Sequence, residues 1–107
     1  MDRRVSVTID RPIGTPHPNH PDILYPINYG FIPGLYSEDG EEQDAYVLGI
    51  DMPLEAYEGR VIAIIRRYDD VEDKWVVAPE GVTYSVAEIR EKTHFQEQFY
   101  HSEILLR

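Results

Sequence analysis

Carboxylates gather in two short stretches of the chain. The first holds five carboxylates within seven residues, and the second holds four within five. Like charges this close repel one another, so each stretch favours either water or a bound cation. Carboxylate oxygens suit hard cations such as Mg²⁺, Mn²⁺ or Ca²⁺. The two stretches are Glu38, Asp39, Glu41, Glu42 and Asp44, and then Asp69, Asp70, Glu72 and Asp73.

The two acidic stretches make one metal site only if the fold brings them together. The first precedes an apolar run at 45–51, and the second joins the runs 61–68 and 75–78. Antiparallel pairing of these runs could place both stretches at the same end of a barrel. An EF-hand is excluded, because Gly40 comes too early and the Glu of the twelfth position is missing. Two solvated hairpin turns remain the alternative to a metal site.

Two tyrosines and an asparagine stand just before the first acidic stretch. The Tyr25 and Tyr29 hydroxyls and the Asn28 amide could hydrogen-bond phosphate oxygens without carrying charge. The alternative is that both rings belong to the core, with their hydroxyls reaching the surface. Further along, Arg66 and Arg67 are adjacent on an expected strand, so they point to opposite faces and one of them could face a site.

The remaining polar residues offer weaker signals. His17 and His20 lie in a proline-rich loop and are expected to be solvated, and no histidine pair has metal-ligand spacing. No serine sits in a nucleophile elbow, and no glycine-rich phosphate loop is present.

Strands are the main elements available to position these residues. Val5, Val7 and Ile9 alternate with polar residues, which predicts a strand with one buried face. Five prolines make residues 10–26 an extended loop, and Gly30 marks a bulge or a close backbone approach. A Glu58-Gly59 turn is expected before the strand 61–68. The predicted strands are 5–9, 27–32, 45–51, 61–68 and 75–78.

One helix follows the strands. Ser85 and Glu88 fit a capping box, flanked by the hydrophobic staple of Tyr84 and Ile89, and no Gly or Pro interrupts the chain up to about Tyr100. The apolar tail 103–106 should pack back onto the domain. We therefore predict one domain over residues 1–107 that is mainly β with one C-terminal helix, a small β-barrel closed on one side by the helix.

Composition narrows the class of protein. The 107 residues contain 42% hydrophobic and 11% aromatic residues, which argues against disorder. The chain has no Cys, which excludes disulfide scaffolds and Cys-ligated metal sites. Its net charge of −10 disfavours nucleic acid as a partner. No apolar run approaches the ~20 residues of a membrane span, and no signal peptide is visible, so we expect a soluble, cytoplasmic protein without a membrane partner.

A longer pattern resembles a known family. The run from Tyr25 to Asp44 reads YPINYGFIPGLYSEDGEEQD. It resembles the signature of the soluble, magnesium-dependent inorganic pyrophosphatases, Y-P-x-N-Y-G-Y-I followed by D-G-D-P-x-D. The likeness continues through the second acidic stretch and the strand after it to His94-Phe95, and so covers residues 25–100.

The resemblance implies a fold, an activity and a set of site residues. It implies a five-stranded OB-like barrel that often forms homo-oligomers. The implied activity is the hydrolysis of pyrophosphate, a small phosphate-containing substrate. The implied cofactor is Mg²⁺, for which Mn²⁺ could substitute. Asp44 would orient or deprotonate the attacking water, near Tyr29. The implied metal ligands are Asp39, Glu41, Asp44, Asp69, Asp70 and Glu72, and the implied substrate contacts are Lys74, Tyr25, Asn28 and Arg67.

The chain also departs from the family pattern. Only about two dozen residues precede Tyr25, and they contain no Lys, although Asp10 or Arg11 could be remnants of the family's N-terminal site residues. The helix end reads Phe99-Tyr100 where the family has Tyr-Lys. These losses leave open a catalytically silent barrel that binds metal, phosphate or a partner, and an OB-type nucleic-acid module that the charge disfavours.

Overall fold

The computed structural model describes residues 3–70 and 72–107. Six strands and one helix make up the described chain. The sheet contains a closed ring of five strands, in which β1 pairs with β2, β2 with β3, β3 with β5, β5 with β4, and β4 again with β1. In order, the elements are β1 (Arg4–Arg11), β2 (Asn28–Tyr36), β3 (Glu42–Val47), β4 (Ala56–Arg67), β5 (Asp73–Ala78), α1 (Val86–Glu97) and β6 (Ser102–Leu106).

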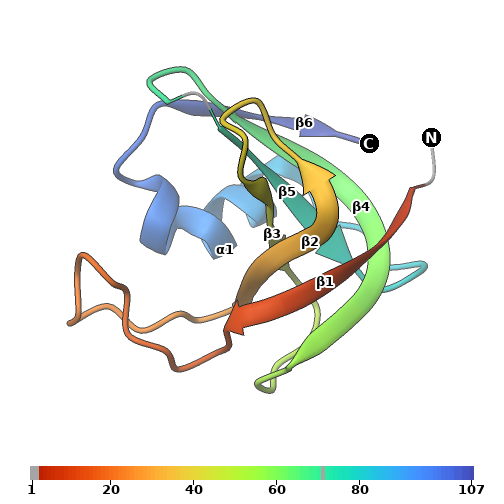
Figure 1. The fold of residues 1–107 in the computed structure, drawn as a ribbon, viewed down its shortest axis with the longest axis horizontal. Coiled ribbons are helices and arrows are strands. Elements are labelled where there is room, and N and C mark those ends of the chain that lie inside the picture. Colours follow the sequence, from red (N-terminus) through yellow and green to blue (C-terminus); the bar gives the residue numbers. More distant parts are fainter. Residues whose placement is uncertain (1–2, 71) are drawn as a thin grey trace.

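The five-stranded barrel confirms the predicted fold class. Figure 1 shows the strands curling around a common core, with α1 to one side, above the orange loop of residues 12–27. β6 lies outside the ring and pairs antiparallel with the second half of β4. The predicted packing of tail 103–106 is therefore confirmed, in the form of a sixth strand. Along the described ranges, the chain has no helix with the length and apolar character needed to cross a membrane.

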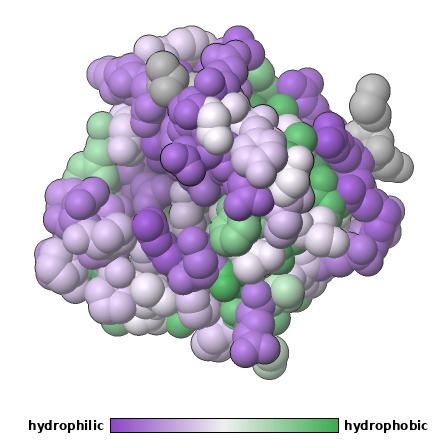
Figure 2. Space-filling view, viewed as in Figure 1, coloured by the Kyte–Doolittle hydropathy of each residue, from purple (hydrophilic) through white to green (hydrophobic). Residues whose placement is uncertain are grey.

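Alternation along the strands divides the core into two clusters. In β3, Ala45 and Val47 belong to the cluster inside the barrel, whereas Tyr46 belongs to the cluster beneath α1. This follows from the strand period of two, which sends successive side chains to opposite faces. Ile89 of α1 is fully buried in the second cluster. Figure 2 shows that much of the surface facing the viewer is hydrophilic, in keeping with the high content of charged residues.

The helix begins where the sequence predicts. The Ser85 hydroxyl accepts a hydrogen bond from the Glu88 backbone N–H at 3.1 Å, and the Glu88 carboxylate accepts one from the Ser85 N–H at 2.8 Å. This reciprocal capping box satisfies two backbone donors that the first turn leaves without helical partners. The helix ends at Glu97 rather than near Tyr100.

Two glycines in the barrel hold strands close together. A Cβ on Gly30 would lie 1.8 Å from the Thr8 carbonyl oxygen, which confirms the predicted close approach. Gly59 does not form the predicted turn before a strand, because it lies inside β4, paired with Val5. A Cβ there would lie 2.8 Å from the Ala78 carbonyl oxygen, so this glycine also serves a close approach.

The predicted pairing of the strands that follow the acidic stretches is wrong in direction. β3 and β5 are parallel, with Ala45 opposite Trp75. Parallel pairing places the starts of both strands at the same end of the barrel. Each acidic stretch leads into one of these starts and ends within the strand, so the two stretches do meet at one end, for a different reason from the one the sequence indicated.

Candidate active site

The site is built where β3 and β5 begin side by side. Asp44 precedes Ala45 and Lys74 precedes Trp75, and these two strand positions are paired in the parallel register. The carboxylate and the ammonium therefore come together, and Lys74 Nζ lies 2.6 Å from Asp44 Oδ2.

Lys74 is the centre of this end of the barrel. The residue is 3% exposed, and its ammonium donates hydrogen bonds to the Tyr29 hydroxyl at 2.8 Å, to Asp44 and to Glu72. Burial alone would lower the pKa of Lys74, but the neighbouring Tyr29 and Asp44 oxygens raise it above its ordinary value. Lys74 is therefore charged at neutral pH. Burial raises the pKa of the Tyr29 hydroxyl, which stays protonated.

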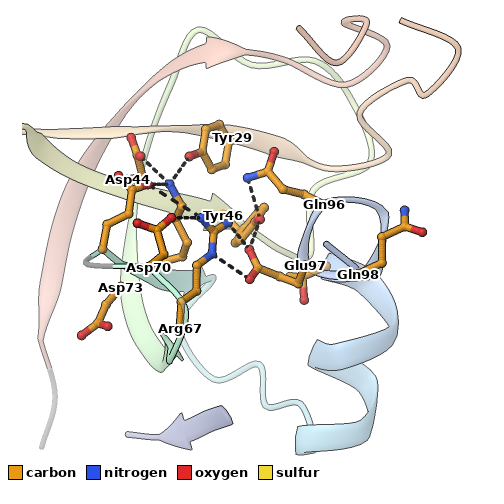
Figure 3. A network of polar contacts seen from close by, with 12 residues as sticks. Tyr29, Asp44, Tyr46, Arg67, Asp70, Asp73, Gln96, Glu97 and Gln98 are labelled. Atoms are coloured by element: carbon orange, nitrogen blue, oxygen red, sulfur yellow. Dashed lines mark hydrogen bonds and ion pairs between the residues drawn. The ribbon is translucent and has the colours of Figure 1, made fainter. Parts of the chain in front are cut away.

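Arg67 supplies a second buried cation, held by α1. Its Nε and Nη2 donate to the two carboxylate oxygens of Glu97 at 3.0 and 2.7 Å. Its Nη1 donates to Asp70 at 3.2 Å, and the guanidinium lies 3.7 Å from the ring centroid of Tyr100. Figure 3 shows Arg67 between Asp70 and Glu97, with Tyr46 donating to the same Glu97 carboxylate. Of the two adjacent arginines, Arg67 is the one that lies at this end of the barrel, where it lines the pocket.

Arg11 provides the third cation of this end. Arg11 Nη1 donates to the Tyr25 hydroxyl at 2.9 Å, and Tyr25 donates to Gln96 Oε1 at 2.8 Å. The β1–β2 register shifts between Ile9 and Arg11, which is a bulge at Asp10. A bulge re-aims side chains, so two adjacent residues can face one site instead of opposite faces.

The three cations line one pocket of about 340 Å³. Its charged lining consists of three cations and four carboxylates, drawn from β1, β3, β4, β5 and the acidic loop before β5. Burial raises the pKa of the Asp10 carboxyl, although Arg11 opposes the shift. The charged residues in the lining are Asp10, Arg11, Asp44, Arg67, Asp70, Glu72 and Lys74.

Two histidines also line the pocket, which corrects the expectation that they are solvated. His17 is 6% exposed, and its ring stacks on Tyr25 with centroids 5.8 Å apart. His20 stacks on Phe99 at 4.2 Å. These contacts fold the proline-rich loop against the end of α1. Burial, followed by the proximity of His20, lowers the pKa of His17.

Some predicted site residues lie elsewhere. The Asn28 amide is fully buried and bonds to the backbones of Ile13, Met52 and Leu54, so it ties loops together outside the pocket lining. The Asp69 carboxylate accepts from the His101 N–H at 3.1 Å. The lining therefore includes Tyr29, Asp44, Arg67, Asp70, Glu72 and Lys74, but not Tyr25, Asn28, Asp39, Glu41 or Asp69.

Of the first acidic stretch, Asp44 lines the pocket, whereas Asp39 and Glu41 do not. Asp39 accepts hydrogen bonds from the Ser37 hydroxyl and the Glu41 N–H, and its carboxyl also interacts with Glu72. Glu41 is exposed. The hydrogen bond from Ser37 is the leading reason that the pKa of Asp39 is lowered.

The carboxylates do not form a ready metal cage. In the described ranges, no group of three or more His, Asp or Glu side chains is placed to hold a metal ion. Asp44 and Glu72 are bridged by the Lys74 ammonium, and Asp70 is paired with Arg67. The donor chemistry suits a hard cation, but the arrangement is that of carboxylates already paired with cations.

Several residues of the site could not be assigned from motifs. Gln96 and Glu97 are buried at 7% and 8% exposure and follow Ile89 by seven and eight positions, so they continue its helix face. The sequence signal that could have identified this pair is the presence of polar residues on the helix face that carries Ile89. Nothing in the local sequence marks the burial of His17, because it depends on a distant contact with α1.

Comparisons with known proteins agree with this geometry. A family model described as inorganic pyrophosphatase matches residues 7–102. An inorganic pyrophosphatase of Halobacterium salinarum is 40% identical over 65 residues, which cover 57% of this chain and 37% of that protein. One of Saccharolobus solfataricus is 44% identical over 59 residues, covering 52% and 34%. In these alignments the chain spans about a third of the length of the curated relatives.

Solved structures share the fold. An inorganic pyrophosphatase from Ehrlichia chaffeensis superposes with a TM-score of 0.72 at 18% identity, over 94% of this chain and 83% of that one. One from Thermus thermophilus gives a TM-score of 0.64 at 21% identity, over 97% and 80%. At this level of identity the likeness concerns the fold, including the closed barrel.

Proposed function

The chain belongs to the inorganic pyrophosphatase family, and on that premise we propose that it hydrolyses inorganic pyrophosphate to phosphate. The observation that carries the proposal is the meeting of three cations with Asp44 and Tyr29 in one pocket. The three cations, Arg11, Lys74 and Arg67, come from β1, β5 and β4. Pyrophosphate is a small polyanion, and these three cations supply positive charge that the lysines missing from the family pattern do not.

In the proposed complex, the cations bind the phosphate oxygens. Arg67 is fixed by Glu97 and Tyr100, so its guanidinium is presented with little loss of conformational freedom. Lys74 lies beside Tyr29, whose protonated hydroxyl is a neutral hydrogen-bonding group. Tyr25 acts through Arg11, which it holds by a hydrogen bond.

For the chemical step we assign Asp44 as the general base. Its carboxylate faces the pocket and takes a proton from a water molecule. The water oxygen bonds to one phosphorus, and the bond from that phosphorus to the bridging oxygen breaks. The second phosphate leaves with the electron pair of that bond, and the proton passes to product phosphate.

The proposal includes finer points that the resemblance implies. Inorganic pyrophosphatases are generally metal-dependent, and Mg²⁺, with Mn²⁺ as a substitute, is the metal we propose here. The proposal also includes a homo-oligomer and a cytoplasmic place of action. Size-exclusion chromatography with light scattering measures the subunit count.

Phosphate release from pyrophosphate tests the function. The assay is run with Mg²⁺, with Mn²⁺, and with chelator, on the unmodified protein and on Asp44→Asn. Asp73→Asn is the matched control, because Asp73 lies one residue from Lys74 but points away from the polar network (Figure 3). We expect turnover that Asp44→Asn reduces and Asp73→Asn leaves unchanged. Pyrophosphate binding without phosphate release under any of these conditions would reject hydrolysis and favour a silent barrel.

A further inference from the structure

The Lys74 ammonium already fills the space between the carboxylates of the site. An ammonium has three N–H donors, and all three are used, by the Tyr29 hydroxyl, Asp44 and Glu72. Asp39 adds a third carboxyl next to Glu72. A side chain of the protein therefore occupies the position among these oxygens where an external cation would be expected.

The ammonium is more deeply buried than the carboxylates that it contacts. The Lys74 side chain is only 4% exposed, whereas those of Asp44 and Glu72 are 32% and 23% exposed. The carboxylates can thus be reached from the pocket while the ammonium sits behind them. Without the ammonium, the two carboxylates would be close like charges, which require either a proton or another cation.

We propose that the Lys74 ammonium is the resident cation of the Asp44–Glu72 pair, and that a divalent cation binds there only by displacing it. The flexible four-carbon stem of lysine allows the ammonium to leave its partners without a change of the backbone. The two binding events are coupled reciprocally. An anion that binds the Lys74 ammonium in the pocket raises the affinity of the carboxylates for the metal, and bound metal favours the release of Lys74 from them. This inference concerns metal binding and does not depend on turnover.

A Mn²⁺ titration followed by calorimetry tests the displacement. Lys74→Met keeps an unbranched apolar stem and removes the charge. We expect it to tighten Mn²⁺ binding by about tenfold or more, because a competing positive charge a few ångströms from the ion is gone. Arg66→Met is the control, because it removes one positive charge from the neighbouring arginine outside the pocket. It should change the affinity by less than about twofold, since exposed charges are screened.

A second measurement uses the unmodified protein, so it does not depend on the folding of a variant. Acetylation of lysine is followed by mass spectrometry with and without saturating Mn²⁺. Lys92 is the only other lysine and is exposed on α1, so it serves as the internal reference. We expect Lys74 to be protected without Mn²⁺ and to be labelled several-fold faster with it, relative to Lys92.

Three outcomes would overturn the proposal. The first is Mn²⁺ affinity that is equal or weaker in Lys74→Met than in the unmodified protein. The second is Lys74 labelling that bound Mn²⁺ leaves unchanged. The third is the absence of Mn²⁺ binding in both the unmodified protein and Lys74→Met.

Discussion

Removal of the Glu97 charge should destabilise the protein strongly. The Glu97 carboxylate accepts three hydrogen bonds, from Arg67 Nε, from Arg67 Nη2 and from the Tyr46 hydroxyl at 2.6 Å. The side chains of Arg67 and Glu97 are only 2% and 7% exposed. In Glu97→Gln, the buried guanidinium loses its carboxylate partner on the helix side, while the amide can accept only part of the former hydrogen bonding.

The magnitude follows from the burial of the pair. Breaking a buried ion pair by removing one partner costs about 3–5 kcal/mol, because the remaining charge stays buried. Asp70 still pairs with Arg67 at 3.2 Å, so we expect the lower end, about 3 kcal/mol. Against a typical stability of about 5–15 kcal/mol, this is a large fraction. With a slope of about 1.5 kcal/mol/M, the urea midpoint should fall by about 2 M.

Urea unfolding followed by circular dichroism measures this loss. Glu91→Gln is the matched control, since Glu91 is an exposed residue of the same helix and should cost less than about 0.5 kcal/mol. The double variant Arg67→Met/Glu97→Met removes both charges and should recover most of the loss. A Glu97→Gln midpoint close to that of Glu91→Gln, or a double variant no more stable than the single one, would refute the reasoning.

Four further results are expected. Asp44→Asn should lower turnover by roughly 10²-fold, whereas Tyr29→Phe should cost about 1 kcal/mol in kcat/KM; equal, small effects in the phosphate-release assay would place both away from the chemistry. Gly30→Ala should destabilise by about 3 kcal/mol or more in urea unfolding, because its Cβ would meet the Thr8 carbonyl oxygen at 1.8 Å; a normal midpoint contradicts the close approach. Burial lowers the pKa of His17 below 6.5, so the unfolded chain takes up the proton first and the free energy of unfolding should fall from pH 7.5 to pH 5.5. His17→Gln should flatten this pH dependence, and an unchanged dependence in that variant would contradict the assignment.

Local sequence patterns predicted the helix and the strands better than they predicted which strands pair with each other. The capping box of Ser85 and Glu88 is a property of four consecutive residues, so the sequence could place the helix start. The parallel pairing of β3 and β5 closes a barrel of five strands, and it depends on every other pairing in the ring. No residue of either strand carries that information alone.

The proline-rich loop shows the same limit on the scale of a single side chain. Prolines predicted an irregular segment, and most of residues 12–27 is irregular. Its burial comes from His17 and His20, which contact the Tyr25 and Phe99 rings. Phe99 follows them by about eighty residues along the chain. The pocket wall therefore depends on a contact between chain ends that local composition cannot indicate.

The two adjacent arginines show how register decides a functional residue. The strand period predicts that they face opposite ways without saying which one reaches the site. In the structure, Arg66 is opposite Asp73 in β5 and Glu103 in β6, so acidic residues flank it on both neighbouring strands. Arg67, the next residue in the strand, points to the opposite face, where it forms an ion pair with Glu97.

Position also changes what the net charge means. A net charge of −10 argues against anion binding only when the basic residues are dispersed. Three of the ten basic residues line a single pocket, and two of them, Arg67 and Lys74, are almost fully buried. Their charges act at short range and in lower dielectric than those of the surface carboxylates, which water and salt screen. A strongly acidic chain can therefore present three cations to a small phosphate anion in one pocket, although four carboxylates share the lining of that pocket.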